Sequence, residues 1–154
     1  MNHNIESIKA TRKFLLELIK DLSTEELNAV PQGFNNNIIW NLGHMVAAQQ
    51  GICYLRAGLS PIVEEKFILE FKPGTKPERK YDDSEIEGIK QMMFDTLDRF
   101  LVEFEKNTFG SYNTFTTRYE VVLSNIHEAV SFLQFHEGLH TGYIMALKKV
   151  VKTA

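Results

Sequence analysis

The chain has 154 residues, enough for one domain with a hydrophobic core, and we expect a single domain over residues 1–154. Hydrophobic residues make up 44% and charged residues 24% of the sequence, as in ordinary globular proteins. The net charge of −3 gives no reason to expect a nucleic acid or an anionic membrane as partner. The one cysteine cannot form an internal disulfide, and no apolar leader or membrane span is visible, so we expect a cytoplasmic protein.

Hydrophobic residues at three- and four-residue spacing predict a mostly helical chain. In the first predicted helix, over residues 4–22, polar residues lie between the hydrophobic ones. They include Glu6, Lys9, Arg12, Lys13 and Lys20. Long helices are expected over residues 4–22, 37–57, 84–107 and 125–151, with a short helical turn between Ser23 and Pro31.

Capping residues mark the boundaries of these helices. Three positions have a capping residue followed three places later by Glu, which is the spacing of a capping box. One Asn is placed as an N-cap and one Gly as a C-terminal stop. These residues are Ser23 with Glu26, Ser84 with Glu87, Asn125 with Glu128, then Asn37 and Gly58.

Two connections separate the helices. Residues 60–83 are rich in Pro and Gly and form a long connection, with a little local structure expected at Val63–Phe71. Residues 112–123 favour extended backbone, but we expect an irregular crossing because no other segment offers a strand partner. The prediction is an all-α, up-down four-helix bundle with a long crossover between helices 2 and 3.

Three of the five histidines are predicted to meet in the core. His136 and His140 are four residues apart, so they differ by only ~40° around a helix and share its apolar face. His44 lies on the face of helix 37–57 that carries Trp40 and small residues. Three neutral imidazoles can hold one metal ion and leave a coordination position open. The alternative is a set of core histidines satisfied by hydrogen bonds.

The remaining candidate ligands are expected elsewhere. His127 precedes His136 by nine residues and therefore lies ~180° away, on the solvent side. Cys53 follows His44 by nine residues, so we interpret it as a packing residue. His3 falls in the N-terminal tail, which we expect to be mobile.

The letters from His136 to His140 also read H-E-x-x-H, the zinc-protease motif. Proteases of this type take a third ligand from the chain that follows the motif. Here no Asp, Glu, His or Cys occurs after His140. A third ligand would have to come from upstream, which argues against a protease.

Two motifs resemble the DinB/YfiT-like superfamily of metal-binding helical bundles. The stretch from Asn37 to His44 is similar to the W-x-x-x-H start of its second helix, and His136 to Ile144 is similar to its H-x-x-x-H-x-G-x-I helix. The Phe71-Lys72-Pro73-Gly74 stretch also resembles the family. The similarity covers nearly the whole chain in order and spacing.

The resemblance implies a divalent metal ion on His44, His136 and His140. We expect zinc or nickel, with iron or manganese as alternatives, because neutral imidazoles suit several of these metals. The resemblance also implies a frequent homodimer and relatives that include S-transferases using bacillithiol, mycothiol or glutathione. We therefore expect a metal-dependent transferase or hydrolase for a small molecule. Glu137 is a candidate catalytic base or a partner of a metal ligand, or else it points at a neighbouring helix or solvent. Trp40 and Tyr143 are candidates for the substrate pocket, with core packing as the alternative. A non-catalytic metal-binding or interaction bundle is the alternative to an enzyme.

Overall fold

The computed structural model describes residues 2–152, and most of them are helical, so the all-α prediction is confirmed. The elements follow the chain in this order: α1 (Asn2–Ile19), α2 (Thr24–Asn28), α3 (Ile38–Gln49), π-helix η1 (Gln50–Tyr54), 3-10 helix η2 (Leu55–Ala57), α4 (Glu65–Phe71), α5 (Asp83–Glu105), β1 (Phe115–Thr116), β2 (Val122–Leu123) and α6 (Ile126–Val151).

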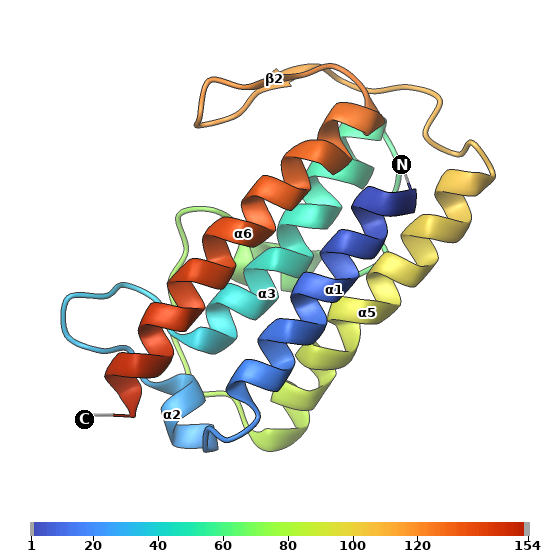
Figure 1. Ribbon diagram of the computed structural model, residues 1–154. Helices are drawn as coiled ribbons and strands as arrows, with labels where there is room; N and C mark the ends of the chain where they lie inside the picture. Colours follow the sequence, from blue (N-terminus) through green and yellow to red (C-terminus); the bar gives the residue numbers. More distant parts are fainter. Residues whose placement is uncertain (1, 153–154) are drawn as a thin grey trace.

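Helices α1, α3, α5 and α6 lie side by side (Figure 1). Helix α1 contacts α5 and α6, and α3 contacts the same two helices. Helices α3 and α5 run in one direction, and α1 and α6 run in the opposite direction (Figure 1). The connection from η2 to α5 therefore returns along the length of α3 and carries α4 against it.

Most helix ends form where the sequence predicts. Ser23 and Glu26 form a capping box, the Asn37 side chain accepts from the Trp40 amide, and Gly58 ends η2 with a φ of +73°. Asn125 caps α6, but the Glu128 carboxylate accepts from the amide and hydroxyl of Ser124 instead of closing a box with Asn125.

The predicted capping box at Ser84 and Glu87 is wrong. Helix α5 starts at Asp83, and its box is formed by Asp82 and Glu85. Asp is as good an N-cap as Ser, and Asp82 has the extended backbone that a cap needs, so the earlier pair begins the helix.

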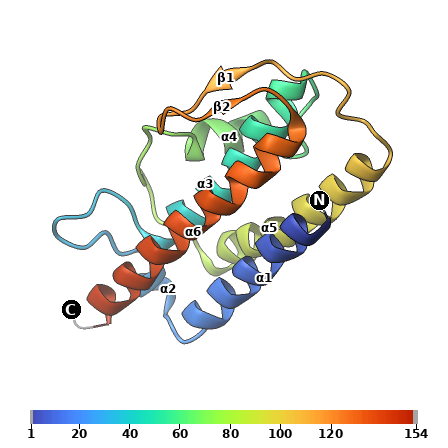
Figure 2. The ribbon, with the colours of Figure 1, turned by 45° about the horizontal axis from the view of Figure 1, so that its top comes forward.

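The prediction of an irregular crossing over residues 112–123 is also wrong. Strands β1 and β2 pair with each other as a short antiparallel hairpin, with Phe115 opposite Leu123 and Thr116 opposite Val122. The segment supplies its own partner by folding back at Thr117–Glu120. Figure 2 shows this hairpin lying across α6, near α4.

Two smaller expectations concern the connection and the N-terminus. Local structure at Val63–Phe71 is confirmed, because α4 occupies most of that stretch. His3 is exposed, but it lies in the first turn of α1 and not in a tail. Throughout residues 2–152, each helix is too short or too polar to cross a lipid bilayer.

Candidate metal centre

Helix α3 carries His44, whose ring is held by a stacking contact and by a hydrogen bond. The ring stacks on Trp40, one helical turn earlier, with centroids 4.7 Å apart and an interplanar angle of 8°. The Nδ1–H of His44 donates to the carbonyl oxygen of Phe71, the last residue of α4, at 2.7 Å. Trp40 is tied to the same connection, because its Nε1–H donates to Thr75 Oγ1 at 2.9 Å. The long connection thus fixes both rings.

Gly43 allows this close approach of α4 to α3. A Cβ at this position would lie 2.5 Å from atoms of the Phe71 ring. The same Phe71 supplies the carbonyl oxygen that orients His44. The lack of a side chain at residue 43 is therefore part of how the site is built.

Helix α6 brings two more imidazoles to the same point. The ring centroids of His136 and His140 are 4.5 Å apart, and both rings lie about as close to His44, at 5.1 and 4.8 Å. One nitrogen from each of the three rings can be chosen so that all lie within 4.8 Å of one another. The structure therefore brings together the three histidines that the sequence singled out.

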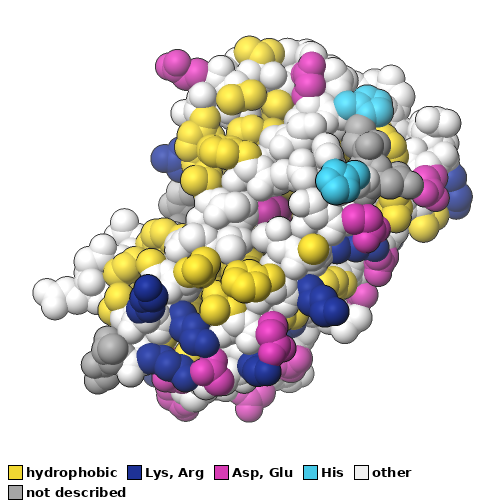
Figure 3. Space-filling model, viewed as in Figure 1, with side chains coloured by type: hydrophobic (Ala, Val, Ile, Leu, Met, Phe, Trp, Pro, Cys, Tyr) yellow, Lys and Arg dark blue, Asp and Glu magenta, His cyan; other side chains and the backbone are white. Residues whose placement is uncertain are grey.

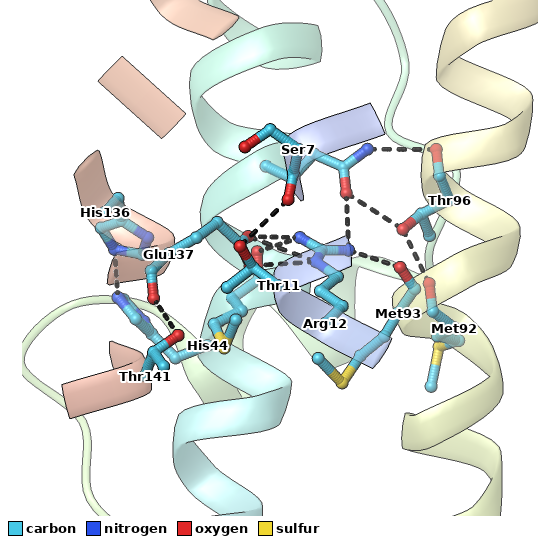
Figure 4. A network of polar contacts seen from close by, with 12 residues as sticks. Ser7, Thr11, Arg12, His44, Met92, Met93, Thr96, His136, Glu137 and Thr141 are labelled. Carbon is cyan, nitrogen blue, oxygen red and sulfur yellow. Dashed lines mark hydrogen bonds and ion pairs between the residues drawn. The ribbon is translucent and has the colours of Figure 1, made fainter. Parts of the chain in front are cut away.

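The donor set fits a metal ion. The Nδ1–H groups of His44 and His140 donate to the Phe71 carbonyl and to Asn41 Oδ1, which leaves each Nε2 with a free lone pair. The Nε2 atoms of His44 and His136 are 3.2 Å apart (Figure 4). Two nitrogens ~2.0–2.1 Å from one ion would be separated by about 3.0–3.4 Å. Among the described residues, His136 Nδ1 has no hydrogen-bond partner.

Burial keeps these imidazoles neutral, which is the form that binds metal. It lowers the pKa of His136 to about 2, with further lowering by His140, His44 and Arg12. It lowers the pKa of His140 to about 3, with a contribution from His44. The pKa of His44 is also lowered, first by burial and then by the charge of Arg118, against the hydrogen bond to Phe71.

Glu137 points away from this cluster and binds Arg12 in the core (Figure 4). Arg12 Nη2 lies 2.6 Å from Glu137 Oε1, and Arg12 Nε lies 3.1 Å from Oε2. The same guanidinium donates to the carbonyl oxygens of Met93 and Met45 and to Gln49 Oε1. Burial raises the pKa of the Glu137 carboxyl, and Arg12 opposes that rise. One guanidinium thus links α1 to α3, α5 and α6.

The expectation that Arg12 lies with the polar residues of the first helix, between its apolar positions, is wrong. Arg12 is 0% exposed, because it lies on the buried face of α1 with Ile8, Leu15 and Ile19. Asn41, which accepts a hydrogen bond from His140, is a site residue that was not identified from the sequence. It lies three residues before His44 on α3, so it faces the same side of that helix.

A cavity of about 1060 Å³ opens beside the three histidines. Trp40 and Tyr143 line it, whereas Glu137 and Cys53 are not among its described lining residues. Residues of η1 and η2, including Gly51 and Arg56, form one wall, and the hairpin contributes Phe115, Arg118 and Tyr119. A cavity of this size suits a small molecule.

The other two candidates lie outside the cluster. His127 is exposed on α6, with its ring edge-on to Phe104. Cys53 is completely buried, and burial raises the pKa of its thiol to about 12, so it stays a neutral packing residue. Their placement agrees with the helical spacing.

These features define an all-α protein with three buried or nearly buried histidines that could hold a metal ion. The family model of the DinB superfamily matches residues 7–144, so the chain belongs to the DinB superfamily. A search of curated proteins gives no significant match.

Proposed function

We propose that this protein is a metal-dependent enzyme acting on a small molecule, as a thiol-dependent S-transferase or a hydrolase. The observation that supports it is the position of the three imidazoles on the wall of a cavity of about 1060 Å³. A site with protein ligands on one side and a cavity on the other leaves a coordination position for water or substrate.

His44, His136 and His140 would hold the ion. Neutral imidazoles suit zinc and nickel, which we propose first, with iron or manganese as alternatives. When bound, such an ion lowers the pKa of a coordinated thiol or water and so supplies a nucleophile at neutral pH. The Phe71 carbonyl and Asn41 would fix the ring orientation of two ligands, as partners of metal-bound histidines commonly do.

Trp40 and Tyr143 would bind substrate, since both line the cavity. A direct catalytic role for Glu137 stays a prediction. Its hydrogen bonds to Arg12 favour an indirect role, in which the ion pair fixes the rotation of α6 and therefore the direction of His136. Glu137 and His136 are neighbours on α6, so a turn of that helix would move both.

We also infer the finer architecture expected from the sequence. The arrangement of α1, α3, α5 and α6 supports one four-helix bundle over residues 1–154, with the crossover in the connection that carries α4.

The homodimer implied by the family resemblance is a further proposal. Figure 3 shows hydrophobic side chains gathered in patches on the face that α6 and the hairpin occupy in Figure 1. Along α6, Phe135, Leu139 and Met145 are 47%, 41% and 43% exposed. Light scattering should report a dimer that Phe135→Ser with Met145→Ser converts to monomer. A monomeric parent chain would contradict the proposal.

Turnover tests the enzymatic proposal. Metal-loaded protein is assayed with a panel of low-molecular-weight thiols and electrophiles, with and without chelator, beside His44→Ala. Metal-dependent turnover that His44→Ala abolishes would support an enzyme. A tightly bound metal without turnover on any substrate, together with a fall in melting temperature on its removal, would favour the non-catalytic bundle.

A further inference from the structure

The charged side chains that line the cavity, apart from the histidines, are all positive. They are Arg56, Lys72, Lys76 and Arg118. No Asp or Glu of residues 2–152 lines the cavity, although the chain has a net charge of −3. None of the four forms an ion pair with a carboxylate of the described chain. Cations that line a cavity without counter-charges attract anions.

Arg118 reaches the cavity from the turn of the hairpin. The turn is closed by a hydrogen bond of 2.9 Å from the Thr117 amide to the Val121 carbonyl oxygen, and Glu120 has a φ of +61°. Tyr119, which directly follows Arg118, packs edge-on against Phe135 of α6, with ring centroids 5.2 Å apart. The hairpin is therefore anchored to the helix that carries His136 and His140 (Figure 2).

Among the four cations, Arg118 lies on a segment that packs against α6 next to His136. The ring of the neighbouring Tyr119 lies 6.2 Å from that of Phe132 and 5.2 Å from that of Phe135, both on α6 within about one turn of His136. Besides burial, the positive charge of Arg118 contributes to the lowered pKa of His44. Arg56 stacks closely on Phe115, with its guanidinium 4.1 Å from the ring centre, whereas the guanidinium of Arg118 lies 5.8 Å from the centre of the Tyr119 ring. Arg118 is thus the cation placed to bind an anion that lies next to the three imidazoles.

The rest of the wall is largely apolar. It includes side chains of η1 and η2 and of α6, such as Ile52, Leu55, Phe132 and Leu139. We propose that the cavity binds a small molecule with an apolar body and an anionic group, a carboxylate or a phosphate, and that Arg118 binds the anion. The inference rests on the proposed function for its biological meaning, because a ligand there lies against the candidate metal ligands.

Binding to metal-free protein tests this inference separately from catalysis. After dialysis against chelator, calorimetry measures the affinity for phenylacetate, for phenyl phosphate and for the neutral phenylacetamide. The two anions distinguish a carboxylate site from a phosphate site. The variants are Arg118→Met, Arg118→Lys and, as a matched loss of charge outside the cavity, Lys13→Met on the exposed side of α1. Circular dichroism checks that each variant is folded.

We expect at least one anion to bind about tenfold or more tightly than phenylacetamide, since a charged hydrogen bond is lost in the amide. Arg118→Met should remove that preference, Arg118→Lys should restore part of it, and Lys13→Met should leave it unchanged. Equal binding of anion and amide, or anion binding that Arg118→Met does not weaken, would overturn the inference. So would anion binding that occurs only with metal present and is independent of Arg118. If the parent protein binds the anion as expected but binds no metal ion, that result would instead count against the proposed function.

Discussion

Arg12 and Glu137 form an ion pair in the centre of the molecule, with 2.6 Å between Nη2 and Oε1 and both side chains at most 1% exposed. The pair joins α1 to α6 directly beside His136. Its position makes the core of this protein sensitive to any change that leaves one charge without the other.

Arg12→Met should lower the free energy of unfolding by about 3–5 kcal/mol, because the Glu137 carboxylate would remain buried without its partner. Glu137→Gln should lower it by a similar amount. The double variant Arg12→Met/Glu137→Met should be less destabilised than the sum of the single changes. Urea unfolding measures all three. A loss below about 1 kcal/mol in both single variants would show that the pair contributes little.

Gly43→Ala should weaken metal binding roughly tenfold or more, because the new methyl group would displace Phe71 and its carbonyl oxygen from His44. It should also cost about 1–3 kcal/mol of stability through overpacking. Gly88→Ala is the matched control, since a Cβ at that helical position meets nothing within 4 Å. The control should bind metal normally and be stabilised by up to about 1 kcal/mol. Equal metal affinity in the two variants would argue against the role of Phe71.

Asn41→Ala should also weaken metal binding, by about 10–100-fold, because His140 would lose the acceptor that orients its ring. Asn41→Asp keeps an acceptor and should retain more affinity than Asn41→Ala. A competition titration with a chromogenic chelator gives both values. If Asn41→Ala binds metal as tightly as the parent chain, His140 is oriented by something other than this hydrogen bond.

Much of the fold and of the histidine cluster could be predicted because both depend on helical periodicity and capping. His44, His136 and His140 lie on apolar faces at regular spacing. Arg12 has helical spacing from Ile8, Leu15 and Ile19, which is consistent with its place on the buried face, but its charge is typical of a solvated residue. Its partner Glu137 is 125 residues away, and no local pattern connects the two.

Other features depend on contacts between different segments of the chain, which the spacing of residues along a single helix does not reveal. The orientation of His44 by the Phe71 carbonyl arises from the fold of the long connection. The hairpin forms because residues 115–123 pair with one another, and the extended preference of the segment does not by itself show where it folds back. Arg118 reaches the cavity only as a result of that pairing.

Metal-free protein should lose stability as the pH falls below about 6.5. Burial depresses the pKa of His136 to about 2 and of His140 to about 3, whereas in the unfolded chain both are close to 6.5. The unfolded state therefore binds protons first, at up to roughly 1.4 kcal/mol per pH unit for each imidazole. Melting temperatures from pH 7.5 to 5 in chelator test this, with the exposed His127→Gln as control. A melting temperature that does not change over this range would contradict burial of neutral histidines.

Elemental analysis of protein purified without an affinity tag, beside His44→Ala, His136→Ala and His140→Ala, tests the metal site most directly. We predict about one divalent ion per chain in the parent protein, since three histidines form a single site. Each alanine variant should lose most of its metal while its circular dichroism stays helical. Full retention of the metal in folded His44→Ala, or a parent chain that binds neither zinc nor nickel, would contradict the account.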